Sequence, residues 1–162
     1  MHIKLVKKKL IFNKYKVKCA LGKRGISIKK KEGDGITPKG TFKLKEVFYR
    51  RDRIGSLKTT LKKTSIKKNM GWCDDPKSKK YNRLIKLPSN YRFEKLHLSK
   101  NIYDVIVVIN FNLRPVIKNK GSAIFIHLTK DYKATKGCIS ISIDDMRTLL
   151  KLVNNKSYIK II

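Results

Sequence analysis

The sequence predicts a mainly β protein, a sandwich or barrel of short strands with one C-terminal helix packed on the sheet. Short apolar runs recur along the chain, Gly, Pro, Asn and Lys turns separate them, and one clear amphipathic helix lies near the C-terminus. A chain of 162 residues has the size of one domain and is long enough to bury about two-thirds of its unfolded surface without disulfides. We therefore expect a single domain over residues 1–162.

Eight short runs are expected to form strands. Their residues are mostly apolar, β-branched or aromatic, and turn-forming residues separate them. In one run every second residue from Tyr15 to Leu21 is apolar, so we expect Cys19 to be a core residue. The expected strands span residues 3–6, 10–12, 15–21, 26–28, 41–47, 104–110, 123–128 and 158–162.

One helix is expected over residues 143–153. Ser142 and Asp145 resemble a capping box at its start. The apolar side chains recur at i, i+3, i+4 and i+7, at Met146, Leu149, Leu150 and Val153. We expect this apolar stripe to pack against the sheet.

Residues 50–70 show no clear periodicity and carry many Arg and Lys side chains. Two interpretations stay open for this segment. It forms either a mobile flap over a site or an ordinary solvated loop.

The chemistry-bearing pattern is a histidine at the end of an expected strand and a cysteine after the following loop. His127 ends the run 123–128, and a polar segment that finishes at Gly137 leads to Cys138. A thiol has a pKa of about 8.5, which falls when an imidazole or backbone N–H groups stabilise the thiolate. Gly137 allows close approach of substrate, and N–H groups around it are candidates for an oxyanion hole. The pattern predicts a cysteine acyl-transfer enzyme.

Residues 135–138, Thr-Lys-Gly-Cys, together with His127 resemble the signature of the L,D-transpeptidase catalytic domain, or YkuD-like family: a strand histidine followed by a Ser/Thr-x-Gly-Cys turn. Residues 35–42 look like the family's Thr-Pro-x-Gly-x-Phe segment, and residues 71–76 and 103–110 look like stretches from one branch of it. Similarity covers most of residues 1–143 and implies an L,D-transpeptidase-like β-sandwich or barrel.

The resemblance also implies which positions contact the substrate. Thr135 belongs to the signature turn, while Lys136 and Ser140 stand where many members have other polar side chains. The His-to-Cys spacing is shorter than in many members, which indicates a trimmed loop. Trp72 is expected to offer the substrate an apolar wall.

The implied substrate is a peptidoglycan stem tetrapeptide or muropeptide, cut between an L-centred third residue, usually a diamino acid, and the terminal D-Ala. His127 deprotonates Cys138, the thiol attacks that carbonyl, D-Ala leaves, and a thioester remains. Transfer to an amine is transpeptidation, and transfer to water is L,D-carboxypeptidation. The resemblance implies no cofactor.

The remaining cysteines and histidines are given structural roles. Cys73 is expected to pack beneath Trp72, His2 is terminal, and His97 should face away from its apolar neighbours. A zinc site would recruit Cys73, His97, His127 and Cys138, but no Cys-x-x-Cys or His-x-x-x-His pair pre-forms half of one. We therefore expect no metal, and three cysteines do not suggest a disulfide framework.

The composition is strongly basic, with 41 Lys and Arg against 11 Asp and Glu and a formal charge of +30. Such a charge favours nonspecific, salt-dependent binding of polyanions. The lysines are spread over the whole chain and lack the helix-turn-helix, zinc-finger or ribonucleoprotein patterns that read bases. A basic adaptor for nucleic acid or another anionic polymer stays as the non-enzymatic alternative.

No membrane span or export signal is recognised. The longest apolar run is residues 105–109, and the N-terminus has no apolar signal region. We therefore expect a cytoplasmic protein, or a periplasmic one if a leader is missing, and a cytoplasmic L,D-carboxypeptidase of peptidoglycan recycling is an alternative to the transpeptidase. The sequence leaves the oligomeric state open.

Overall fold

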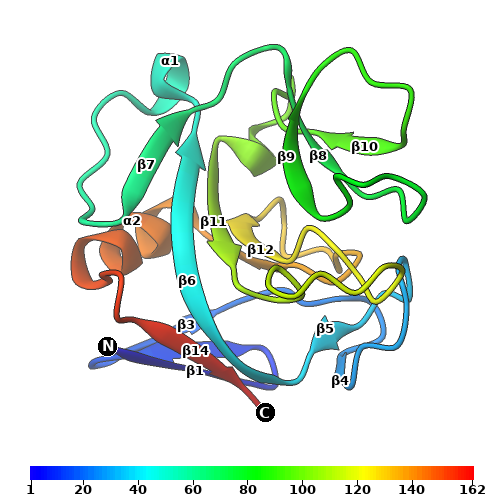
Figure 1. Ribbon diagram of the computed structural model, residues 1–162. Helices are drawn as coiled ribbons and strands as arrows, with labels where there is room; N and C mark the ends of the chain where they lie inside the picture. The colour runs from blue at the N-terminus through cyan, green and yellow to red at the C-terminus, as the bar shows by residue number, and fades with distance from the viewer.

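The computed structural model describes residues 1–162 and is dominated by one strongly curved sheet (Figure 1). The strand order is β13-β12-β11-β6-β14-β1-β2-β3, and β7 pairs with β6 off this path. These strands are β1 (His2–Val6), β2 (Lys9–Phe12), β3 (Tyr15–Lys18), β6 (Gly40–Tyr49), β7 (Lys62–Ser65), β11 (Val105–Ile109), β12 (Phe125–Leu128), β13 (Ile139–Ile141) and β14 (Tyr158–Ile161). The C-terminal strand β14 lies inside the sheet, parallel to β1 and antiparallel to β6.

The two ends of the sheet meet and nearly close it into a barrel. Ala20, just after β3, and Ser140 in β13 exchange two backbone hydrogen bonds of 2.9 and 3.0 Å. Closure removes the exposed strand edges that an open sheet would leave. The prediction of a mainly β, barrel-like fold is confirmed.

The helix α2 (Ile143–Leu152) packs on one face of this sheet. Its buried residues are Met146, Leu149 and Leu150, as the helical spacing predicted. At its start, the Ser142 hydroxyl accepts a hydrogen bond of 3.1 Å from the Asp145 N–H, which confirms the expected cap. None of the helices has the length and apolar character required to span a membrane.

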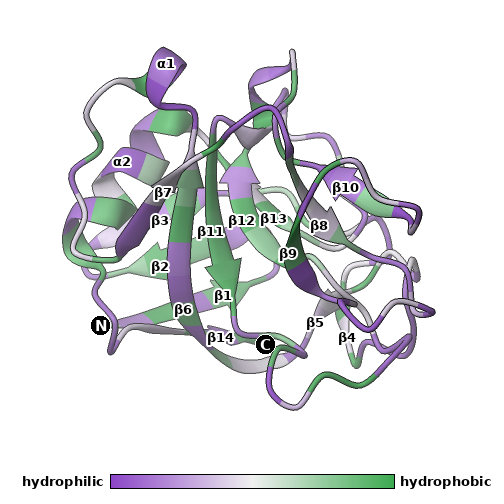
Figure 2. Cartoon of the chain, turned by 45° about the horizontal axis from the view of Figure 1, so that its top comes forward, coloured by the Kyte–Doolittle hydropathy of each residue, from purple (hydrophilic) through white to green (hydrophobic).

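Strand β11 is apolar along its whole length because both of its faces are covered (Figure 2). Val105, Val107 and Ile109 join the main core with α2. Ile106 and Val108 face the other way, into a second apolar cluster. The site lies on this second side.

A smaller sheet covers the second side. It has the order β10-β8-β9, and Figure 1 shows it on the side of β11 and β12 away from α2. Its strands are β8 (Met70–Cys73), β9 (Arg83–Lys86) and β10 (Phe93–Lys95). The sequence analysis expected none of these strands, since each run has only three or four residues. Short elements complete the fold: β4 (Ile26–Ser27), β5 (Thr37–Pro38), α1 (Arg51–Ile54) and the 3-10 turn η1 (Asn101–Tyr103).

Residues 50–70 form part of the fold, and both interpretations given to them are wrong. They contain α1 and β7, and β7 runs parallel to β6. Leu57, Leu61 and Ile66 are buried. The Thr60 hydroxyl donates a 3.0 Å hydrogen bond to the Val153 carbonyl, at the end of α2. Local periodicity missed this segment because its apolar residues are buried by tertiary contacts with α2 and β6.

A buried hydroxyl, Thr37 Oγ1, connects three distant segments. It accepts a hydrogen bond of 2.8 Å from the Gly22 N–H and donates one of 2.9 Å to the Gly137 carbonyl. A Cβ at Gly22 would lie 2.4 Å from the Gly35 carbonyl oxygen, so the approach of the chains requires glycine there. Thr37 thereby holds the turn that precedes Cys138, a role that the resemblance of residues 35–42 to a family segment did not predict.

Thr37→Val should destabilise the protein by about 1–3 kcal/mol, because it leaves a buried N–H and a buried carbonyl without partners while keeping the side-chain shape. Urea unfolding measures the loss as a lower midpoint. Thr41→Val is the matched control, since Thr41 lies exposed on β6 and should change stability by less than about 0.5 kcal/mol. Equal midpoints for the two variants would show that the Thr37 hydroxyl does not hold the turn.

Candidate active site

A cleft of about 950 Å³ lies between the barrel-like sheet and the smaller sheet. Its lining includes the six predicted site residues of the strand and turn: His127, Thr135, Lys136, Gly137, Cys138 and Ser140. No residue of 50–70 reaches it. The cover over the site is the smaller sheet, through Phe93 and Glu94 of β10.

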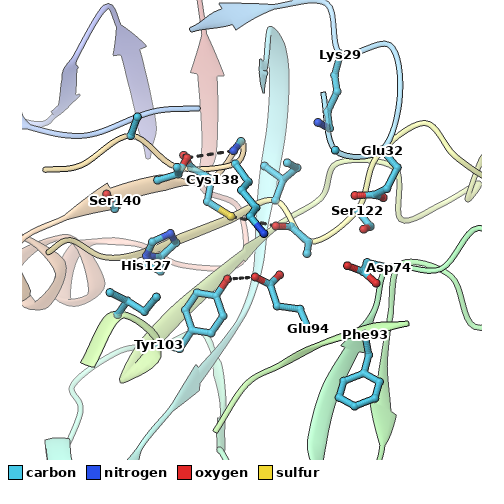
Figure 3. A pocket seen from close by; sticks show the side chains of 18 of the residues that line it. Lys29, Glu32, Asp74, Phe93, Glu94, Tyr103, Ser122, His127, Cys138 and Ser140 are labelled. Carbon is cyan, nitrogen blue, oxygen red and sulfur yellow. Dashed lines mark hydrogen bonds between the residues drawn. The ribbon is translucent and has the colours of Figure 1, made fainter. Parts of the chain in front are cut away.

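The strand register places the proposed nucleophile and base on one face. In the parallel pair β12–β13, His127 lies opposite Ser140 and Ile126 opposite Ile139. Because side chains alternate along a strand, Cys138 and Ser140 point to the same side as His127. Figure 3 shows Cys138 and His127 beside each other on the cleft floor.

The imidazole of His127 is held in one tautomer by the chain itself. Its Nδ1 lies 2.8 Å from the Leu128 carbonyl oxygen, which only accepts, so Nδ1 carries the proton and Nε2 keeps its lone pair. The Tyr103 ring packs edge-on against it, with centroids 5.3 Å apart. Burial lowers the pKa of His127, so the ring is neutral at neutral pH and can accept a proton.

The Cys138 thiol is also neutral at rest. Sγ lies 3.1 Å from the Ala123 carbonyl oxygen, to which it donates. Burial, and next the negative charge of Glu94, raise the pKa of Cys138 to about 12, against a smaller lowering by a backbone hydrogen bond from Phe125. The expected lowering of this pKa is therefore wrong, because removal from water outweighs the stabilising contacts. The pair rests as thiol and imidazole, and the proton must move as the sulfur attacks.

The turn before Cys138 is shaped by Thr135 and Gly137. The Thr135 hydroxyl accepts a 3.1 Å hydrogen bond from the Gly137 N–H and donates one of 2.6 Å to the Cys138 carbonyl. Gly137 has φ +146°, and a Cβ there would lie 2.9 Å from the Ile36 carbonyl oxygen. Its N–H is engaged within the turn, which differs from the expected oxyanion contact. Gly137 instead lets the chain pass Ile36 and present Cys138.

Trp72 does not line the cleft, and its predicted contact with substrate is wrong. It is 4% exposed, its Nε1 donates a 2.9 Å hydrogen bond to Asn82 Oδ1, and its ring packs at a right angle on Phe125. A Trp in a loop-like run looks exposed in sequence, but here it anchors the smaller sheet. Cys19 and Cys73 are buried, as expected of packing residues.

Comparison with known protein families shows to which family the chain belongs. The model of the YkuD family, the L,D-transpeptidase catalytic domain, matches residues 3–161. The chain belongs to this family. YkuD domains are cysteine acyltransferases that act on peptidoglycan peptides. No match was found among curated proteins or solved structures.

This YkuD domain has cleft residues that sequence reasoning missed. The Tyr103 hydroxyl, from η1, donates a 2.5 Å hydrogen bond to Glu94 Oε1, from β10. Burial raises the pKa of Glu94, and the negative charges of Asp74 and Glu32 raise it further, while the Tyr103 hydrogen bond and the charge of Lys136 lower it. No spacing signal joins positions 32, 74, 94 and 103, because they come together only through the docking of the smaller sheet.

Alkylation of Cys138 by iodoacetamide should accelerate about tenfold per pH unit from pH 6 to 10, because the thiolate fraction keeps rising below a pKa of about 12. Peptide mapping separates Cys138 from the two buried cysteines, and the Cys138→Ala protein gives the background. A rate that is already constant below pH 8 would indicate a thiolate–imidazolium pair and contradict the neutral resting state.

Proposed function

We propose that the protein is an L,D-transpeptidase-type cysteine acyltransferase whose nucleophile is Cys138 and whose donor is a peptidoglycan stem tetrapeptide. One observation carries this proposal. A thiol and an imidazole share the floor of one cleft, on the same face of the β12–β13 pair. Membership of the YkuD family supports the reaction class.

In the proposed reaction, Sγ of Cys138 attacks the carbonyl carbon of the third stem residue while Nε2 of His127 takes the thiol proton. The Leu128 carbonyl stabilises the imidazolium, because it accepts the hydrogen bond from Nδ1–H at 2.8 Å. When the tetrahedral intermediate collapses, the C–N bond to D-Ala breaks and His127 returns the proton to the leaving amine. A thioester on Cys138 and free D-Ala result.

The acceptor decides the product. An amine from a second stem regenerates the thiol and gives a 3-3 crosslink, whereas water gives the tripeptide by L,D-carboxypeptidation. Both acceptors use the same thioester and the same base, since each must lose a proton as it attacks. We propose the shared acyl-transfer chemistry for either acceptor, and the cytoplasmic L,D-carboxypeptidase of peptidoglycan recycling is the alternative to the transpeptidase.

Cys138→Ala should abolish D-Ala release from a disaccharide tetrapeptide, and His127→Gln should reduce it by about 10²- to 10⁴-fold through loss of the base. Mass spectrometry follows D-Ala with and without a second stem, so that tripeptide identifies the hydrolase and a dimer the transpeptidase. Cys73→Ala and His97→Gln are the matched controls, because neither residue lines the cleft. Full activity of Cys138→Ala, or equal losses at both histidines, would contradict the mechanism.

A second proposal concerns binding of polyanions, and one face of the sheet favours it. The outward side of β3, β2, β1, β14 and the first half of β6 exposes seven lysines together with His2 and Thr41, and no Asp or Glu lies in these strands before Glu46. The strand pairs align several of these side chains, such as Lys4 with Lys160 and Lys9 with Lys18. The exposed lysines are Lys4, Lys9, Lys16, Lys18, Lys43, Lys45 and Lys160.

The affinity of the protein for DNA should be similar for unrelated DNA sequences, because the lysines contact phosphates and do not read bases. This affinity should fall steeply from 50 to 200 mM salt, because binding releases counterions from the DNA. Fluorescence anisotropy measures it. The triple variant Lys4→Gln, Lys16→Gln and Lys160→Gln should bind more weakly than a control with Lys77, Lys118 and Lys120 changed to Gln. Tight, salt-resistant and sequence-selective binding would favour the adaptor over the enzyme.

A further inference from the structure

The connection between β10 and β11 contains three successive carbonyls that no backbone N–H reaches. Arginine side chains at α1 supply their donors instead. Arg50, directly before α1, donates through Nη1 to the Leu98 carbonyl at 2.9 Å. Arg53 donates through Nη2 to the Ser99 carbonyl at 3.0 Å and through Nη1 to the Lys100 carbonyl at 3.4 Å. The arginines therefore fix the path of a segment that has no backbone pairing of its own.

The far end of the same connection, at Asp104, is held by the same two arginines. The Asp104 carbonyl accepts a 2.8 Å hydrogen bond from the Arg50 N–H, and its carboxylate forms a 3.1 Å ion pair with Arg53 Nη1. Arg53 thus uses its planar fork on two carbonyls and one carboxylate, a geometry that lysine does not reproduce. Arg50 is buried and is itself fixed by Asp52, whose Oδ1 lies 2.8 Å from Nε. The bonds fall on both sides of η1.

The segment held in this way covers the imidazole of His127. Ile102 and Tyr103 of η1 line the cleft. The Tyr103 ring lies edge-on to His127, with centroids 5.3 Å apart, and its hydroxyl donates to Glu94 (Figure 3). Burial lowers the pKa of His127, while the carbonyls of Leu128 and Ile102 oppose this with smaller contributions. η1 thus supplies both part of the cover over the ring and one of the carbonyls that act on it.

One turn of 3-10 helix is not enough to hold this cover in place. The internal hydrogen bond of η1 runs from the Asp104 N–H to the Asn101 carbonyl at 3.0 Å. Such turns are short and their hydrogen bonds have poor geometry, so contacts from outside decide their position. The position matters because the proton must pass from the thiol to the ring as the sulfur attacks. A misplacement of about 1 Å costs on the order of 10²-fold in rate.

We propose that Arg50 and Arg53 are positioning residues for the base: they hold η1 against His127, so that the imidazole keeps one orientation beside the thiol. The inference rests on the proposed function. It gives a role to α1, although no residue of 50–70 lines the cleft. The arginines act through the carbonyls before η1 and through Asp104 after it, and they do not touch the substrate.

The test follows the imidazole itself by NMR. The chain has three histidines, His2, His97 and His127, so isotope-labelled histidine gives few signals, and the His127→Gln protein identifies the signal of the base. His2, on β1, is the internal reference. Burial places the titration midpoint of His127 below that of an ordinary histidine. In Arg53→Met the midpoint should move to higher pH, because η1 loosens and water reaches the ring.

The cover is the cause that this variant changes. No charged side chain contributes to the lowered pKa of His127. The titratable groups beside the ring are Tyr103 and Cys138, and both remain in the variant.

Arg51→Met is the matched control, because Arg51 is exposed on the same helix and its side chain makes none of these bonds. Its midpoint should equal that of the unchanged protein. Arg53→Lys keeps a cation beside Asp104 but cannot hold both carbonyls, so it should give a smaller shift in the same direction and replaces Arg53→Met if that variant does not fold. An unchanged midpoint in every folded Arg53 variant, or the same shift in Arg51→Met, would overturn the proposal.

Turnover separates this inference from the proposed function. In Arg53→Met, kcat for D-Ala release should fall at least about tenfold while KM changes by less than about threefold, because the orientation of the base acts on the reaction step. A moved midpoint with unchanged kcat, or a loss confined to KM, would contradict the positioning role. If the unchanged protein releases no D-Ala but the midpoint moves in Arg53→Met, α1 still holds η1 on the ring and the proposed reaction fails. If D-Ala is released and the midpoint does not move, the reaction stands and α1 does not position the base.

Discussion

The closure of the sheet is the constraint on which the site depends. Cys138 lies in no helix or long strand that could fix its position. It directly precedes β13, a strand of only three residues. Its position comes from the Ala20–Ser140 backbone pair and from the Thr37 hydroxyl, which holds the Gly137 carbonyl at 2.9 Å. Contacts between segments about a hundred residues apart therefore orient the thiol, and the main core behind β13 holds those segments in place.

Burial sets the chemistry as much as geometry does. The same removal from water that lowers the pKa of His127 raises that of Cys138, so neither group is charged before substrate arrives. A thiol is less prone than a thiolate to oxidation and to reaction with stray electrophiles. Reactivity then depends on a bound carbonyl that makes transfer of the proton to Nε2 productive.

The sequence predicted the roles of residues that a local pattern identifies. It did not predict the roles of residues that depend on contacts between distant segments. His127 and Cys138 were recognisable because a strand, a polar loop and a glycine turn follow one another. Glu94 and Tyr103 were not, since nothing in a single sequence shows that β10 docks over β12. Trp72 was misassigned for the same reason: its partner Phe125 is far away in the chain. The raised pKa of Cys138 could not be predicted from the sequence, because its main cause is the burial of the thiol in the folded protein.

The place of β14 in the sheet has a consequence for biosynthesis. This strand contains residues 158–161 and lies between β6 and β1, in the interior of the sheet. On one side of the sheet, the N-terminal strands β1, β2 and β3 are connected to β6 through β14, so the complete sheet cannot assemble before residues 158–161 have been synthesised. Such non-local pairing is slow and comes late in folding. The sheet that orients the thiol and the imidazole is thus complete only once β14 has paired with β1 and β6, and a chain that stops before residue 158 cannot form it.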